Sequence, residues 1–193
     1  MLAIMRRRLV EISGPGADIA IIDSFPMPLS MSHRRYTTKI FKDIADVGKN
    51  TTKNVKFYGF KAHVMTSATG IVLNYSITKA SIHDVRVAPE LIAESPCKNI
   101  LADMGYIGED YVAYAKDLGY NFWTPYRSNM NGAKEQNSYD LIRCRGKIER
   151  CFSILNSNYD IEKNRARSLT GFQTRFKVSL LMYNLGFYDL PIN

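Results

Sequence analysis

Three acidic residues could together form a metal-dependent active site. Asp23 follows the apolar run of residues 19–22, Asp103 follows a second apolar run at residues 100–102, and Glu149 lies in a late stretch with helical periodicity. Carboxylate oxygens are the ligands that Mg²⁺ and Mn²⁺ prefer in proteins. Two such ions about 3.5–4 Å apart can activate a water or hydroxyl and stabilise charge on a phosphodiester. The three acids therefore predict phosphodiester cleavage.

The positions of the acids suggest a role for each. Asp23, on the middle strand, would bridge both ions, while Asp103 and Glu149 would each hold one. Such sites lie beyond the carboxyl ends of parallel strands, where both aspartates are expected. Simpler interpretations stay open: the aspartates could be turn residues, and Glu149 could pair with Arg145 on a solvated helix face. The joint occurrence of the three acids favours the active site.

Alternation and turn residues predict the five strands that would position these acids. The clearest signal is a hairpin of residues 57–65 and 71–78, whose apolar and polar side chains alternate around a loop ending at Gly70. The other strands are expected at residues 19–22, 99–103 and 120–124. Pro26 and Pro28 should stop the first strand, because proline cannot donate to a sheet hydrogen bond.

Helical periodicity predicts four helices. A short one follows His83 and Asp84 with Pro89 in its first turn, and a second, over residues 107–118, ends before Gly119. The Glu149 helix would turn these residues toward the core: Leu141, Cys144, Ile148, Cys151, Phe152 and Leu155. A capping box at residues 170–173 would begin the final helix, whose inner stripe is Phe172, Phe176, Leu180, Tyr183 and Phe187.

The order β-β-β-α-β-α-β-α-α predicts the fold class. It is the order of a ribonuclease H-like α/β fold, with a mixed five-stranded sheet and helices on both faces. We expect one domain, with residues 1–18 as a short lead broken at residues 13–16, and residues 19–187 as the core. A basic insertion would occupy residues 24–56 approximately, and residues 188–193 would form a tail.

The charge of the chain favours a polyanionic partner. Lys and Arg number 26, against 18 Asp and Glu, among 193 residues. Much of the excess lies between residues 24 and 61, where two acids accompany eight basic residues: Arg34, Arg35, Lys39, Lys42, Lys49, Lys53, Lys56 and Lys61. Nucleic acid is the first candidate, and a solvated basic surface is the alternative.

Composition also predicts the location. No apolar run is long enough to cross a bilayer, and the N-terminal charges follow apolar residues instead of preceding them, so we expect neither a membrane span nor a signal peptide. The three cysteines, Cys97, Cys144 and Cys151, are an odd number, and we expect them to be reduced and buried. These features predict a cytoplasmic protein.

Several segments resemble the catalytic core of bacterial insertion-sequence transposases of the Asp-Asp-Glu (DDE) type. The resemblance covers roughly residues 19–187, and its most specific parts are the Asp-x-Gly-Tyr string beginning at Asp103 and the Arg-x-x-x-Glu formed by Arg145 and Glu149. The other similar segments are residues 22–26, 58–63 and 80–84. The resemblance implies a ribonuclease H-like core that uses two Mg²⁺ or Mn²⁺ ions at Asp23, Asp103 and Glu149.

The resemblance also implies the reaction and the partner. Such an enzyme nicks double-stranded DNA at the ends of an element and transfers the 3′ hydroxyl to target DNA, with a homodimer on DNA as one arrangement. The residues expected to contact DNA are Arg34, Arg35, Lys39, Lys42, Lys61, Arg127 and Arg145. Lys61 and His63 share one face of their strand, so the alternative for both is a solvent-facing position.

Two departures from the family pattern keep other functions open. Related transposases often have a Tyr three residues before this Arg and a Lys seven residues after this Glu, where the chain has Ile142 and Asn156. Family members carry a helical DNA-end-binding region ahead of the core, and only 22 residues precede Asp23. The alternatives are an inactive remnant that only binds DNA and a ribonuclease H-like nuclease without strand transfer.

Overall fold

A computed structural model of the protein describes residues 1–13, 18–50 and 53–188. Its six strands are β1 (Ile19–Met31), β2 (Asp46–Asn50), β3 (Val55–Ser67), β4 (Val72–Lys79), β5 (Asn99–Ala102) and β6 (Asn121–Trp123). Its α-helices are α1 (Leu2–Ser13), α2 (Ala88–Ala93), α3 (Glu109–Asp117), α4 (Ala133–Gln136), α5 (Tyr139–Arg145), α6 (Lys147–Tyr159) and α7 (Leu169–Leu185). Short 3-10 turns are η1 (Ser32–Tyr36), η2 (Asp84–Val87) and η3 (Met104–Tyr106).

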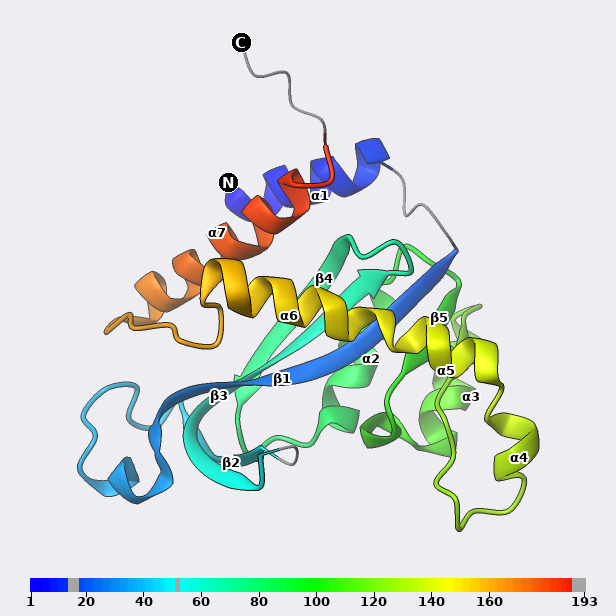
Figure 1. Ribbon diagram of the computed structural model, residues 1–193, viewed down its shortest axis with the longest axis horizontal. Helices are drawn as coiled ribbons and strands as arrows, with labels where there is room; N and C mark the ends of the chain where they lie inside the picture. The colour runs from blue at the N-terminus through cyan, green and yellow to red at the C-terminus, as the bar shows by residue number, and fades with distance from the viewer. Residues whose placement is uncertain (14–17, 51–52, 189–193) are drawn as a thin grey trace.

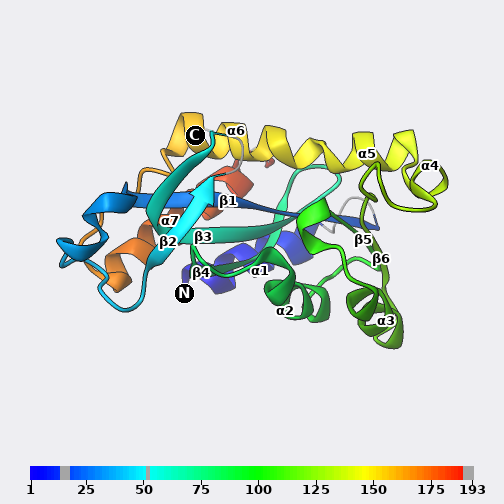
Figure 2. The same cartoon turned by 90° about the horizontal axis from the view of Figure 1, so that it is seen from below.

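The strands form one mixed sheet in the order β2-β3-β1-β5-β6, and β4 also pairs with β3. The pairs β1–β3, β2–β3 and β3–β4 are antiparallel, whereas β1–β5 and β5–β6 are parallel. Helices α5 and α6 lie on one side of the sheet and α2 and α3 on the other (Figures 1 and 2). The predicted α/β class, with helices on both faces, is confirmed, and the sheet has one strand more than the five predicted.

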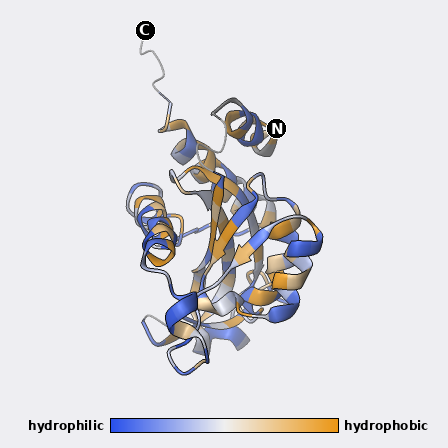
Figure 3. Cartoon of the chain, turned by 90° about the vertical axis from the view of Figure 1, so that its right-hand side faces the viewer, coloured by the Kyte–Doolittle hydropathy of each residue, from blue (hydrophilic) through white to orange (hydrophobic). Residues whose placement is uncertain are grey.

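Two apolar clusters hold the helices to the sheet. One contains Ala20 and Ile22 of β1 with Leu91 of α2 and Ala115 of α3. The other contains Phe25 and Met27 of β1 with residues of α6 and α7: Cys151, Leu155, Phe172, Phe176, Leu180 and Tyr183. The change of cluster along β1 follows from the alternation of side chains across a strand. Figure 3 shows hydrophobic segments along the strands in the middle of the molecule and helices that mix hydrophobic and hydrophilic residues.

The predicted stop of the first strand at Pro26 and Pro28 was wrong. β1 continues to Met31 and stays in register with β3, opposite Lys61 and Gly59. Beyond Ile22 the described part of the chain gives β1 a partner on only one side. Two prolines two residues apart turn their nitrogens to the same side of a strand, and an open edge tolerates them. The expected insertion at residues 24–56 therefore contains most of β1 and the edge strand β2.

The structure differs from several further predictions about the helices. Residues 2–13 form α1, which packs on α7, and the expected break after it falls largely on residues 14–17, outside the described residues. Of the tail, only Tyr188 is described, and its hydroxyl donates to the carbonyl of Leu9. The cap of α7 is Ser168, whose Oγ accepts from the Gly171 amide, so the predicted capping box lay two residues late. Phe187 is exposed because α7 ends at Leu185.

Candidate active site

The sheet brings the first two predicted acids together. β1 and β5 run parallel, and their pairing ends with Ile22 opposite Ala102. The next residues along the chain are Asp23, which stays in β1 opposite Val64 of β3, and Asp103, which directly follows β5, so both aspartates lie at the point where the β1–β5 pairing ends. Asp103 also precedes η3 and turns the chain away from the strand. This arrangement follows directly from two apolar runs of matched length in neighbouring parallel strands.

The third acid comes from the helical layer. The single helix predicted around Glu149 is two: α5 ends at Arg145, Gly146 follows with φ −59° and ψ −14°, and α6 begins at Lys147. Those angles are right-handed, so α6 continues close to the direction of α5 (Figure 1). Ile148, Cys151 and Leu155 are buried against the sheet and fix the orientation of α6. Glu149, in the first turn of α6, is 69% exposed at its side chain.

Arg145 lies at the centre of the three acids. Its guanidinium Nη2 is 3.3 Å from Asp23 Oδ2 and 3.5 Å from Glu149 Oε1, and Nη1 is 3.4 Å from Asp103 Oδ1. Its side chain is only 18% exposed, and its Nε is buried without a hydrogen-bond partner. We call these four residues the acid cluster. Arg145 was expected to pair with Glu149 or with phosphate, and its contacts with both aspartates were not predicted from the sequence.

Burial sets the protonation of Asp23. Desolvation, together with the negative charges of Asp103 and Asp84, raises its pKa to about 6. The hydrogen bond from the Ser24 amide to Asp23 Oδ1, at 2.7 Å, and the charge of Arg145 act in the opposite direction. Desolvation and like charges disfavour ionisation, whereas an amide donor and a nearby cation favour it. Asp23 therefore holds a proton more strongly than an ordinary aspartate.

A second polar network, missed from the sequence, lies behind Asp23. His63 was expected to face solvent or DNA, and this expectation was wrong, since its side chain is fully buried beneath η3. Its ring nitrogens lie 3.1 Å from the Tyr106 hydroxyl and 3.0 Å from Thr78 Oγ1. Burial lowers the pKa of His63 to about 4, so the ring is neutral near pH 7. Because helices were predicted on both faces of the sheet, the burial of a side chain on either face of β3 could have been expected.

Lys61 and Asp84 form the edge of this network. Lys61 Nζ donates to Asp84 Oδ1 at 2.8 Å and to the Ile82 carbonyl at 3.0 Å. Asp84 is the first residue of η2, and its carboxylate pairs with Lys61 at 2.8 Å. Lys61 is thus held by protein groups instead of projecting freely. Asp84 adds a fourth negative charge close to the acid cluster, which its effect on the pKa of Asp23 reflects.

The donor chemistry of the acid cluster suits a divalent cation, but its present arrangement suits an arginine. All three carboxylates supply oxygen, as Mg²⁺ and Mn²⁺ require. Across residues 1–13, 18–50 and 53–188, no three His, Cys, Asp or Glu side chains are grouped closely enough to hold one metal ion. The guanidinium separates the three acids, so ion binding at these residues requires Arg145 to move.

The remaining predicted DNA-contact residues lie elsewhere. Arg34 and Arg35 lie in η1. Arg35 pairs with Asp46 at 3.4 Å, and Lys39 and Lys42 follow in the same connection between β1 and β2. Arg127 lines a cavity with Lys61. The basic residues therefore fall into two groups, one at the end of β1 and one beside η3.

The described helices include none long and apolar enough to cross a membrane.

Comparison with known proteins gives the family. No curated protein matches the chain. A family model described as the transposase DDE domain matches residues 13–169. That range includes Asp23, Asp103, Arg145 and Glu149, and it covers most of the 193 residues. Because this model matches more than half of the chain, the chain belongs to the transposase DDE domain family.

Proposed function

We propose that this protein is the catalytic core of an insertion-sequence transposase, which nicks double-stranded DNA at element ends and transfers the 3′ hydroxyl to target DNA. The observation that supports this most is the convergence of Asp23, Asp103 and Glu149, from three separate elements, on one guanidinium at 3.3–3.5 Å. Three carboxylates around one cation, two of them where the parallel pairing of β1 and β5 ends, suit the charge of a divalent ion bound to phosphate.

Each residue of the acid cluster has a role in this proposal. Asp23, Asp103 and Glu149 would hold two Mg²⁺ or Mn²⁺ ions, which, when bound, would activate the attacking oxygen and stabilise charge on the phosphate. Buried Asp23 provides a fixed carboxylate, and exposed Glu149 can adjust its position. Arg145 keeps the aspartates together before DNA arrives and, once displaced, can donate to a phosphate oxygen.

The decisive experiment uses labelled duplex DNA that carries the terminal repeats flanking the gene, with Mn²⁺. Cutting at the repeat ends followed by joining to a second duplex is the expected result. Cutting that shows no preference for the repeat ends and is not followed by joining would favour a nuclease. DNA binding without cutting would favour an inactive remnant.

Arg145 gives a prediction about metal binding. We expect Arg145→Gln to lower the stability of the metal-free protein by about 2 kcal/mol, since charge-assisted hydrogen bonds are lost and the carboxylates repel one another. For a chain of this size, that is a decrease in melting temperature of about 4–8 °C. Mn²⁺ should raise the melting temperature of the variant more than that of wild type, because the ion no longer competes with the guanidinium.

Arg143→Gln is the matched control for this prediction. Arg143 lies in the same helix, is exposed, and forms no ion pair within the described residues. Thermal melting in chelator and in Mn²⁺ should therefore give wild-type values for it. Equal Mn²⁺ stabilisation of wild type and Arg145→Gln would show that Arg145 and the ion do not share the carboxylates.

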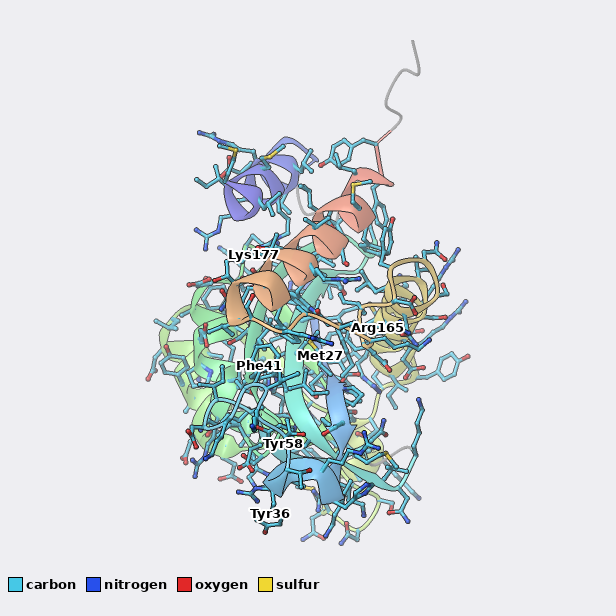
Figure 4. All side chains as sticks on the ribbon, turned by 90° about the vertical axis from the view of Figure 1, so that its left-hand side faces the viewer. Met27, Tyr36, Phe41, Tyr58, Arg165 and Lys177 are labelled. Atoms are coloured by element: carbon cyan, nitrogen blue, oxygen red, sulfur yellow. The ribbon has the colours of Figure 1, made fainter. Side chains whose placement is uncertain are left out.

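The connection between β1 and β2, residues 32–45, forms a basic arm that we propose contacts DNA away from the acid cluster. Figure 4 shows Tyr36 at the outer end of this arm and Phe41 and Tyr58 nearer the body. Phe41 is buried and its carbonyl accepts from the Tyr58 hydroxyl at 3.0 Å, which anchors the arm. Tyr36 is 90% exposed. The arm therefore has a fixed base and an exposed, basic tip.

Neutralising the arm should weaken DNA binding in a salt-dependent way. Replacement of Arg34, Lys39 and Lys42 by Gln should lower the slope of log affinity against log salt by about 2.7, at about 0.9 for each phosphate contact. Arg35 is left unchanged because it pairs with Asp46. Fluorescence anisotropy across a salt series measures the slope. Gln at Arg165, which precedes α7, and at Arg175 and Lys177, which lie within α7, is the control of equal charge. An unchanged slope would mean that the arm does not contact DNA and is only a solvated surface.

A further inference from the structure

A cavity of about 900 Å³ lies beside the acid cluster. One wall contains Met104 and Gly105, the two residues that follow Asp103. Opposite them are residues of β2 and β3, and the polar connection that begins at Arg127 contributes a third wall. Lys61 and Arg127 of this lining were predicted DNA contacts, and Lys49 and Lys56 belong to the basic segment that favours a polyanionic partner. We call this space the lysine cavity.

The lining of the lysine cavity carries a strong positive charge. Its cations are Lys49, Lys56, Lys61 and Arg127, and its single acid is Asp84. Asp84 is already paired with Lys61 at 2.8 Å. Over the ranges that the structure describes, the other three cations form no ion pair with an acidic group. The cavity therefore has an excess of positive charge that the protein itself does not neutralise.

The arrangement of two of these lysines is unfavourable unless an anion is present. Lys49 of β2 and Lys56 of β3 are directly opposite each other in the antiparallel pair. Side chains at directly opposite positions project from the same face of the sheet, and both line the cavity. Like charges in such a pair destabilise the sheet. An anion bound between the two ammonium groups would remove this repulsion.

We propose that the lysine cavity binds the sugar–phosphate backbone of DNA next to the scissile phosphate. This assignment rests on the proposed function, because it takes DNA as the substrate of the acid cluster. The cations lie on separate walls, from Arg127 to Lys49 and Lys56, which suits a chain of phosphates more than one small anion. Asn129 and Ser81 also line the cavity and can donate hydrogen bonds to phosphate oxygens.

The test compares two double variants that lose equal charge. In Lys49→Gln/Lys56→Gln, the salt slope for binding a DNA duplex should fall by about 1.8, and by about 1.4 for a single strand. The control is Lys98→Gln/Lys116→Gln, which changes residues before β5 and at the end of α3, toward the other end of the sheet. Its slope should match wild type. All binding is measured in chelator, so the result does not depend on catalysis.

Two further measurements separate the proposal from its competitors. The melting temperature of Lys49→Gln/Lys56→Gln should be equal to or higher than that of wild type, because the opposed charges are gone, so weaker binding would not reflect misfolding. Inorganic pyrophosphate is the small-anion probe. If it binds in a lysine-dependent manner while the DNA slopes stay unchanged, the cavity is a small-anion site and the proposal is overturned.

Failure of the proposed function would look different. In one outcome, the wild-type protein never nicks DNA in Mn²⁺, but the salt slope of Lys49→Gln/Lys56→Gln is still about 1.8 lower than that of wild type. This outcome would contradict the catalytic proposal and leave the lysine cavity as a DNA-binding site. In the opposite outcome, the wild-type protein nicks DNA and the double variant keeps the wild-type salt slope. This outcome would support the catalytic proposal and contradict DNA binding by the lysine cavity.

Discussion

Asp23→Asn should decrease metal-dependent nicking by about a thousandfold or more. The change replaces a charged ligand oxygen with a neutral amide at a carboxylate that is largely buried and next to Asp103. Charge stabilisation by bound metal contributes several kcal/mol to phosphodiester cleavage, and each 1.4 kcal/mol is about tenfold in rate. DNA affinity should stay close to wild type, because Lys and Arg supply the phosphate contacts.

Single-turnover nicking in Mn²⁺, together with anisotropy in chelator, measures both quantities. Asp117→Asn is the matched control, since Asp117 is an exposed aspartate at the end of α3. Its nicking rate should equal that of wild type. Residual cutting by Asp23→Asn at the wild-type rate would contradict the role of Asp23, and the proposed reaction would then have to use other residues.

The same variant should change how stability depends on pH. The pKa of Asp23 is raised from 3.8 to about 6 in the folded protein, so the folded state binds this proton more tightly than the unfolded chain. Its favourable contribution is present below about pH 4 and is lost as pH rises through 6, with a total of about 3 kcal/mol. Asn carries no titrating proton, so Asp23→Asn should become more stable relative to wild type across this interval.

Thermal melting in chelator at pH 4 and pH 7 tests this prediction. The difference in melting temperature between variant and wild type should shift by about 6–12 °C in favour of the variant at the higher pH. Asp117→Asn, measured in parallel, should show no comparable shift. Mn²⁺ should raise the melting temperature of wild type more than that of Asp23→Asn, since it binds the ionised site in the folded state. A constant difference across pH would mean that Asp23 titrates as an ordinary aspartate.

Local sequence patterns determined the parts of the fold that depend on neighbours in the chain. The hairpin of β3 and β4 followed from alternation and from Gly70, whose φ of +104° suits glycine. The buried positions of α6 and α7 followed from helical spacing. The adjacency of Asp23 and Asp103 also followed, because two apolar runs that form neighbouring parallel strands bring their final residues to the same edge.

Contacts between distant segments decided the rest. Pro26 and Pro28 could remain within β1 only because β5 is short and leaves an open edge, a property of the sheet and not of the strand. His63 became buried and neutral because η3, about forty residues later, covers it through Tyr106. The pattern of β3 alone gives no information about what covers its second face.

The acid cluster also depends partly on local sequence patterns and partly on contacts between distant segments. The sequence determined which carboxylates meet, but Arg145 reaches both aspartates only because α5 and α6 pack along the sheet. The pKa of Asp23 depends on the surrounding desolvation and on the charges of Asp103, Arg145 and Asp84, since electrostatic interactions act through space. The sequence thus determined the chemical groups, whereas the tertiary structure decided their protonation and placed an arginine between them.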